Sequence, residues 1–133
     1  MKVPAEIVPA ETGSMGYPPR SYRFDMIVDS GANVTSMSVE RAEGKALQAA
    51  LHANGYQYYN DSMRDASGVI SRTKTFKDVP FTLIATDSKS GAVVRETITV
   101  DELMLMPTGD FHLLGYEDMR KFKRIKFVNQ AKD

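Results

Sequence analysis

The order of apolar and polar residues along the chain predicts a protein made mostly of β-strands. Residues 22–28 alternate and then become wholly apolar before Asp29, which is typical of a strand that enters a core. Residues 79–86 and 92–100 flank a polar turn at 87–91, and this pattern predicts a β-hairpin. Shorter β-rich runs predict further strands at 34–37, 56–59, 69–75, 103–106 and 125–128.

Two segments follow a helical period instead. Residues 39–54 carry alanine and leucine at spacings of three and four, with Ser38 as the expected N-cap and Gly55 as the glycine that ends the helix. Residues 117–122 begin with acidic residues and are followed by basic ones, as the helix dipole favours. The pattern therefore predicts a mostly β fold with a helix at about 39–54 and a short C-terminal helix at about 117–122.

The length of 133 residues is enough for one domain. Four of the six prolines stand in residues 1–20, together with two glycines. We expect residues 1–20 to form an extended N-terminal arm, with one short edge strand at 6–8, and residues 21–133 to form the domain.

Composition removes several classes of function. Lysine plus arginine and aspartate plus glutamate both number 17, and this balance argues against nucleic-acid and polybasic membrane binding. The chain has no cysteine and two histidines, so we expect no disulfide, no thiol catalysis, no metal site and no cofactor. No apolar run is long enough to span a membrane and no signal peptide is seen, which predicts a cytoplasmic protein.

One short segment carries the chemistry of interest. An apolar strand delivers Asp29 into a tight turn that continues with Ser30, Gly31 and Ala32. Gly31 lets the backbone turn sharply and leaves room for a ligand or a second chain to approach. The Ser30 hydroxyl is able to tie the turn to a neighbour. Asp29 is therefore the candidate catalytic acid, although a turn-forming aspartate with ordinary turn residues after it is the alternative.

The sequence resembles the retropepsin-like aspartic proteases, the family of retroviral and retrotransposon proteases, in two blocks. The first is the apolar strand with Asp29-Ser30-Gly31-Ala32, and the second is Leu113-Leu114-Gly115 with the short helix after it. The blocks stand in the family's order. The resemblance spans about residues 22–128 and implies a retropepsin-like acid protease fold, a closed, barrel-like half of a pepsin-type enzyme.

The resemblance also implies a role for each block. Asp29 would be the catalytic residue of an aspartic endopeptidase, with Ser30, Gly31 and Ala32 as its active-site loop. Leu113, Leu114 and Gly115 would pass beneath that loop, where Gly115 avoids a side-chain clash. A β-hairpin flap would close over an extended peptide or polyprotein substrate, and its best match is the turn formed by Ala66, Ser67, Gly68 and Val69.

The chemistry of this family needs two carboxyl groups. Two that lie close together share one proton, so that one activates water while the other hydrogen-bonds the substrate carbonyl. The chain has a single Asp-Ser-Gly motif. The second carboxylate is therefore expected from a homodimer that places Asp29 of each subunit on the two-fold axis, with greatest activity under mildly acidic conditions.

Other interpretations stay open. The domain could bind peptides or dimerise without cutting, or it could be a piece excised from a longer polyprotein. A calcium loop around Gly68 is disfavoured, because Met63 and Lys74 would stand at two ligand positions that require oxygen. His112 is expected at the surface or at an interface, without a catalytic role.

Overall fold

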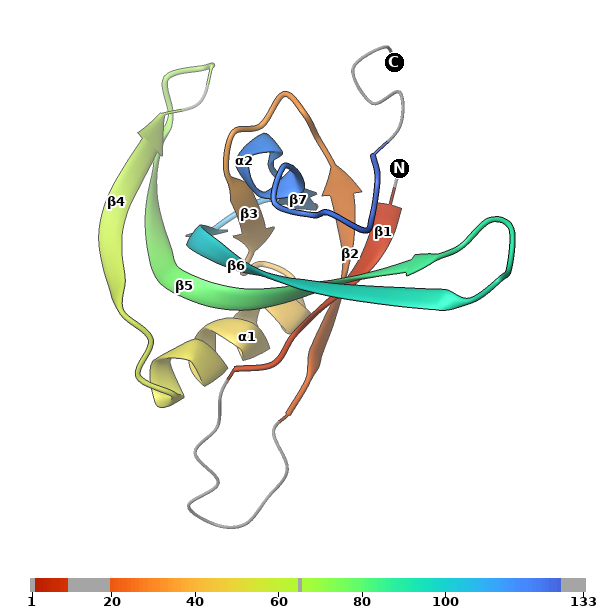
Figure 1. The fold of residues 1–133 in the computed structure, drawn as a ribbon. Coiled ribbons are helices and arrows are strands. Elements are labelled where there is room, and N and C mark those ends of the chain that lie inside the picture. Colours follow the sequence, from red (N-terminus) through yellow and green to blue (C-terminus); the bar gives the residue numbers. More distant parts are fainter. Residues whose placement is uncertain (1, 10–19, 65, 128–133) are drawn as a thin grey trace.

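The computed structural model describes residues 2–9, 20–64 and 66–127, and it is mostly β (Figure 1). The strands of this described part are β1 (Lys2–Ile7), β2 (Tyr22–Val28), β3 (Thr35–Ser38), β4 (Tyr58–Arg64), β5 (Ile70–Thr86), β6 (Val93–Met106) and β7 (His112–Leu114). The helices of the same residues are α1 (Ala42–Ala53) and α2 (Tyr116–Met119). The predicted mostly β composition with two helices is confirmed.

Six strands close into a mixed β-barrel. They follow each other in the order β1, β2, β7, β3, β6, β5, and β5 returns to β1 through the pairs Ala5↔Leu83 and Glu6↔Thr82. Two pairings, β2 with β7 and β3 with β6, are parallel, whereas the others are antiparallel. Closure leaves the first half of β5 free to extend beyond the barrel, where it carries β4 along its other edge.

The strand β5 is long because it belongs to two hairpins. Its first half pairs with β4, from Tyr58↔Phe76 to Arg64↔Ile70, and most of its length pairs with β6. The predicted hairpin around 87–91 is confirmed. Two pairs of expected short strands, however, are each one continuous strand. The chain passes from one half of β5 to the other through Asp78, which takes a left-handed conformation (φ 55°) within the ladder.

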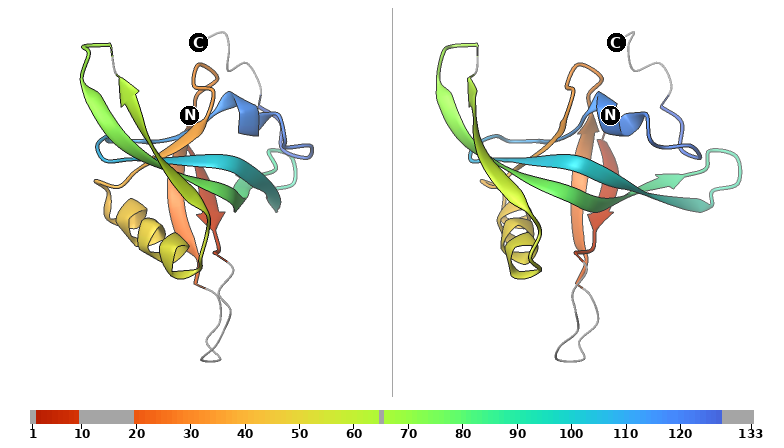
Figure 2. Two further views of the ribbon diagram at one scale, coloured as in Figure 1. Left: turned by 90° about the vertical axis from the view of Figure 1, so that its left-hand side faces the viewer. Right: turned by 60° about the vertical axis from the view of Figure 1, so that its left-hand side comes forward.

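The core fills the barrel and the space between the barrel and α1. In β5 the side chains of Phe76, Val79, Phe81 and Leu83 are fully buried, and Leu47 and Leu51 of α1 close the same cluster from outside the sheet. Figure 2 shows α1 lying against one side of the barrel, below the hairpin of β4 and β5. Burial of this apolar face, more than helix propensity, stabilises a helix that contains a glycine in its interior.

The N-terminal segment differs from the arm that the prolines suggest. Lys2–Ile7 is a barrel strand with neighbours on both sides, and Ala5 and Ile7 are fully buried. The expected edge strand at 6–8 is therefore an internal one that begins earlier. The polar and proline residues of this strand hide the alternation of apolar and polar side chains in the sequence. In the structure, burial of Ala5 and Ile7 is enough to fix the register of the strand. Residues 10–19 of the expected arm lie outside the described residues.

The helix ends also differ from expectation. The N-cap of α1 is Arg41, because Ser38 belongs to β3 and its hydroxyl is held there by the Gly109 carbonyl at 2.5 Å. Gly55 follows the helix with φ 74°, as predicted. The second helix ends at Met119, earlier than expected.

No strand forms over residues 125–127, and residue 128 lies outside the described part. The backbone N–H groups of Lys123, Arg124 and Ile125 donate instead to the carboxylate of Glu96. Of the residues expected to form this strand, Ile125 thus donates its N–H to a side chain and not to a sheet ladder.

His112 is buried at 3% exposure, which contradicts the expectation of a surface or interface position. Its Nδ1 accepts the backbone N–H of Ser38 at 3.1 Å, so the ring proton lies on Nε2, 3.1 Å from the Glu43 carboxylate. A backbone hydrogen bond, together with those from His112 and Arg41, lowers the pKa of Glu43 in spite of its partial burial. His112 therefore joins β7, β3 and α1.

In the part of the chain that the structure describes, no helix has the length and apolar composition needed to cross a membrane.

Candidate functional site

The loop between β2 and β3, residues 29–34, begins with the candidate acid. The backbone N–H of Asp29 donates to the Leu114 carbonyl at 3.1 Å, and the N–H of Ala32 donates back to the Asp29 carbonyl at 3.2 Å. The N–H of Gly31 donates to Oδ1 of Asp29 at 2.9 Å. Among the described residues, Oδ2 of this half-buried carboxylate accepts no hydrogen bond. The loop thus holds one carboxylate oxygen and leaves the other open.

The strand β7 and the start of α2 lie directly under this loop. Leu113 and Leu114 pair in parallel with Ile27 and Val28 of β2. A Cβ added to Gly115 would overlap the carbonyl carbon of Val34, and it would lie 2.8 Å from the Thr35 nitrogen. Only glycine permits such an approach, because every other residue carries an atom at that point.

The first turn of α2 completes the contact with the loop. The N–H of Tyr116 donates to the Ala32 carbonyl at 2.7 Å, and the N–H of Glu117 donates to the Asn33 carbonyl at 3.1 Å. These donors have no acceptor inside a helix because they stand in its first turn. The structure therefore brings together two of the three predicted groups, the loop Asp29, Ser30, Gly31, Ala32 and the support Leu113, Leu114, Gly115.

The third group, the predicted flap, is the turn between β4 and β5. Ala66, Ser67, Gly68 and Val69 are exposed, and Gly68 has a positive φ of 89°. Asp65 lies outside the described residues. Figures 1 and 2 show the tip of this hairpin and the loop between β2 and β3 at the same end of the molecule, separated across that end. The predicted flap therefore lies at the same end of the molecule as the loop that begins with Asp29.

A buried polar cluster, which sequence reasoning missed, stands behind the loop. Thr35 is fully buried and Asp118 is 4% exposed. The Thr35 hydroxyl donates to Oδ2 of Asp118 at 2.6 Å and accepts the N–H of Gly115 at 3.1 Å. In the sequence Asp118 looks like an ordinary acid in the first turn of a helix. Its place three residues after Gly115 is the only local signal, and the partner Thr35 is distant in the chain.

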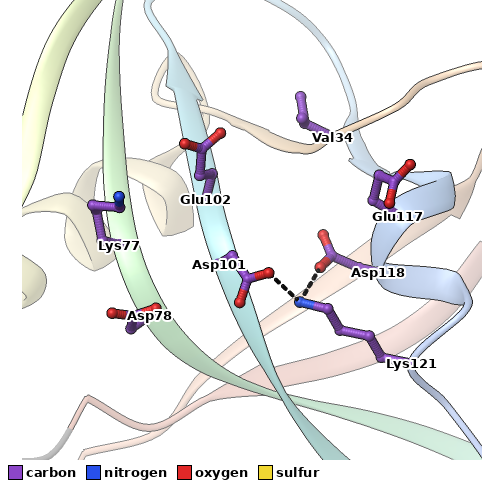
Figure 3. Close-up of a pocket in the computed structure, with 8 residues that line it drawn as sticks. All are labelled: Val34, Lys77, Asp78, Asp101, Glu102, Glu117, Asp118 and Lys121. Carbon is purple, nitrogen blue, oxygen red and sulfur yellow. Dashed lines mark ion pairs between the residues drawn. The ribbon is translucent and has the colours of Figure 1, made fainter.

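Lys121 extends this cluster to the surface. Its ammonium lies 3.3 Å from Oδ1 of Asp118 and 3.1 Å from Oδ2 of Asp101 (Figure 3). It also donates to the carbonyl of Thr99 at 2.8 Å. Burial lowers the pKa of Lys121, but the hydrogen bond that it donates to Asp101 and the charge of Asp118 outweigh burial, and its pKa is raised. The lysine is therefore held charged and ties β6 to the segment after α2.

Two cavities reach Val34, the last residue of the loop. One of about 420 Å³ is lined by Val34, Lys77, Asp78, Asp101, Glu102, Glu117, Asp118 and Lys121 (Figure 3). The other, about 400 Å³, lies under the β4–β5 hairpin and is lined by Val34, Tyr59, Asp61, Ser62, Met63, Arg64, Thr73, Thr75, Glu102 and Met104. Asp29 lines neither of these two cavities.

Within residues 2–9, 20–64 and 66–127, no three histidine, aspartate or glutamate side chains gather closely enough to hold a metal ion.

A comparison of the chain with models of known protein families finds no match, and a comparison with curated proteins finds no relative. The sequence and the geometry described above are therefore the basis for a functional proposal.

Proposed function

We propose that the protein is a retropepsin-like aspartic endopeptidase that works as a homodimer. One observation carries the proposal. The Asp-Ser-Gly block and the Leu-Leu-Gly block are far apart in the chain and pack on each other in the fold. The Asp29 N–H donates a hydrogen bond to the Leu114 carbonyl, and Gly115 lies so close to the backbone of Val34 that no side chain would fit between them. This is the arrangement that the resemblance to retropepsins implies for an active-site loop and its support.

The chemistry assigned to Asp29 fits its surroundings. The Gly31 N–H fixes Oδ1, and the open Oδ2 is free to meet a water or a second carboxyl group. Two such groups brought together share one proton, because both do not readily ionise at short distance. The ionised one takes a proton from water as the water attacks the peptide carbonyl, and the protonated one hydrogen-bonds the carbonyl oxygen.

A second copy of the chain is the source of the second carboxylate in this proposal. Each chain supplies one Asp-Ser-Gly motif. Val69 and Ile70, at the tip of the β4–β5 hairpin, are 57% and 58% exposed, and Tyr116 beside the loop is 44% exposed. These apolar groups stand at the end of the molecule where the loop lies (Figure 2). A two-fold dimer formed through this end would cover them and pair the two aspartates.

The proposed substrate is an extended peptide segment. The β4–β5 hairpin offers the backbone groups of an exposed edge in β4, and such an edge binds an extended peptide as an added strand. The cavity under this hairpin and the cavity beside it meet at Val34 and Glu102 and are of a size to take peptide side chains.

The decisive test compares Asp29→Asn with Asp25→Asn. Asp25 is an exposed residue of β2, the strand that leads into the Asp29 loop, so its replacement controls for the loss of one charge. Each purified protein is incubated with a mixed peptide library from mildly acidic to neutral pH, with and without a statine-type inhibitor. We expect cleavage by the wild type and by Asp25→Asn, blocked by the inhibitor, and a loss of at least a thousandfold in Asp29→Asn, since the base is removed.

Two results would contradict the proposal. Cleavage that survives in Asp29→Asn would remove Asp29 from the chemistry. A wild-type protein that is folded and dimeric in sedimentation but cuts no peptide would favour the alternative, a protease-like domain that binds peptides or dimerises without cutting.

A further inference from the structure

We propose that Asp118 is a positioning residue, which sets the Asp29 loop by fixing the direction of the Thr35 hydroxyl. The consequence for catalysis rests on the proposed function, whereas the consequence for the loop does not. Asp118 lies in α2 and Thr35 is the first residue of β3, directly after the loop. Their hydrogen bond of 2.6 Å is buried.

The Thr35 hydroxyl has one proton, and this decides which way its lone pairs point. The hydroxyl donates its hydrogen bond to Oδ2 of Asp118, so one of its lone pairs is directed at the N–H of Gly115. Without Asp118 as the acceptor of this hydrogen bond, the hydroxyl could turn its hydrogen toward Gly115. The buried N–H of Gly115 would then lose its acceptor. Leaving a buried donor without a partner is strongly unfavourable.

Gly115 is the middle of three consecutive contacts between the loop and its support. Leu114 offers its carbonyl to the N–H of Asp29, Gly115 donates to Thr35, and Tyr116 donates to the carbonyl of Ala32. The entry, the turn and the exit of the loop are thus each held by one of three adjacent residues. A change at Thr35 or Asp118 would shift the middle contact and, through the chain, the two beside it.

Lys121 acts on Asp118 from the other side. It pairs with Oδ1, whereas Thr35 uses Oδ2, and it also reaches Asp101 on β6 (Figure 3). Without a cation, the charge of a carboxylate at 4% exposure would be poorly compensated. We therefore assign Lys121 to pairing with the Asp118 carboxylate, and the hydrogen bond to Thr35 to holding the loop.

The test measures amide hydrogen exchange of Asp29, Gly115 and Tyr116 in four variants of the full chain. Thr35→Val removes the hydroxyl at equal size, and Thr35→Ser keeps it. Asp118→Ala removes the acceptor, and Asp118→Asn keeps an acceptor oxygen without the charge. The control is Val100→Ala, which opens a cavity at a fully buried position on β6 and lowers the free energy of unfolding without touching the loop.

We expect exchange of the three amides to speed up about tenfold more in Thr35→Val and Asp118→Ala than in Val100→Ala, after correction for the free energy of unfolding. Thr35→Ser and Asp118→Asn should stay within about threefold of the wild type. Equal exchange in Thr35→Val and the control would overturn the proposal, as would faster exchange in Thr35→Ser.

Peptide cleavage gives the second readout. We expect Thr35→Val to lower kcat about tenfold or more with a smaller change in KM, because the loop carries the reacting group and contributes only Val34 to the two proposed peptide-binding cavities. If the variants lose protection of the loop amides and the wild type cuts no peptide, the proposed function is rejected and the role of Asp118 stands. Unchanged kcat in Thr35→Val, with an active wild type, would reject the positioning role.

Discussion

At the scale of single residues, two glycines decide how closely segments approach one another. Gly115 lies against the backbone of Val34 and Thr35, and Gly44 lies against the Ser38 carbonyl. Neither contact leaves room for a Cβ. Both have negative or helical backbone angles, so the requirement for glycine comes from space and not from conformation.

Replacing Gly115 by alanine tests this steric requirement. The added methyl group would overlap backbone atoms that have no room to move, and we expect the free energy of unfolding to fall by about 2 kcal/mol or more. Gly91→Ala is the matched control: its φ is 74°, nothing lies within 4 Å of its added Cβ, and its expected cost is about 1 kcal/mol. Urea unfolding measures both. A smaller loss for Gly115→Ala than for Gly91→Ala would contradict the close packing under the loop.

At the scale of elements, the helix α1 is set by packing against β3 as well as by its own sequence. Gly44 is buried in its first half, where an alanine would make a better helix. The contact with the Ser38 carbonyl explains why glycine stands there.

Gly44→Ala therefore separates two effects of opposite sign. Helix propensity alone predicts a gain of about 1 kcal/mol, whereas the overlap with the Ser38 backbone predicts a net loss of about 1–2 kcal/mol. Ala46→Gly, at an exposed position of the same helix, should show the propensity term alone, a loss of about 1 kcal/mol. Thermal unfolding followed by circular dichroism gives the sign. A more stable Gly44→Ala would show that α1 is able to move away from β3.

The carboxylate of Glu96 on β6 holds residues 123–125, which follow α2. Glu96 accepts N–H groups from Lys123, Arg124 and Ile125. Burial raises the pKa of Glu96, but the three backbone hydrogen bonds and the charge of Arg124 outweigh burial and bring it below the ordinary value of 4.5. A carboxylate with a lowered pKa stabilises the fold at pH values above 4.5, and this contribution is lost as the pH falls through the lowered value.

Glu96→Gln should show this pH dependence. We expect the variant to be less stable than the wild type by about 1 kcal/mol at neutral pH, after allowing for solvent around the carboxylate. The difference should stay constant down to about pH 5 and shrink below the ordinary pKa. Urea midpoints across this range, with Glu102→Gln as an exposed control on the same strand, give the result. A difference that grows on acidification would contradict the assignment.

At the scale of the whole molecule, two hairpins project from the barrel in different directions (Figure 2). Each has an exposed apolar residue beside its turn, Ile70 on the β4–β5 hairpin and Val93 on the β5–β6 hairpin. Only the β4–β5 hairpin ends on the side of the Asp29 loop (Figure 1). The proposed dimer and peptide site therefore use one tip and not the other.

Ile70→Ser and Val93→Ser form a matched pair for this proposal. At 58% and 63% exposure, neither change should alter the free energy of unfolding by more than about 0.5 kcal/mol. We expect Ile70→Ser to lower peptide cleavage about tenfold, through weaker self-association or weaker closure over the peptide, and Val93→Ser to leave it unchanged. Cleavage measured over a range of protein concentrations, with sedimentation beside it, separates the two causes. Equal activity in both variants would place the working surface elsewhere.

Local features were predictable from the sequence because their causes are local. Strand β2, the hairpin at 87–91 and the end of α1 at Gly55 follow from period and turn chemistry within a few residues. The Asp29 turn and its Leu113-Leu114-Gly115 partner were visible as motifs, while their role in catalysis stays a prediction. Continuous strands were harder to predict, since pairing with β6 carries β5 through Asp78 in spite of its unfavourable backbone angle.

Tertiary structure alone decided what depends on partners far apart in the chain. Closure of the barrel by β1 and β5 gives the N-terminal segment its second neighbour, and no period within residues 1–20 encodes that neighbour. The bond between Thr35 and Asp118 joins residues 83 positions apart, and only folding removes both from water, so that each must be the other's partner. The sequence by itself determined strand β2, the hairpin turn at 87–91, the end of α1 and the candidate acid; the close packing of chain segments decided which small and polar residues hold that acid in place.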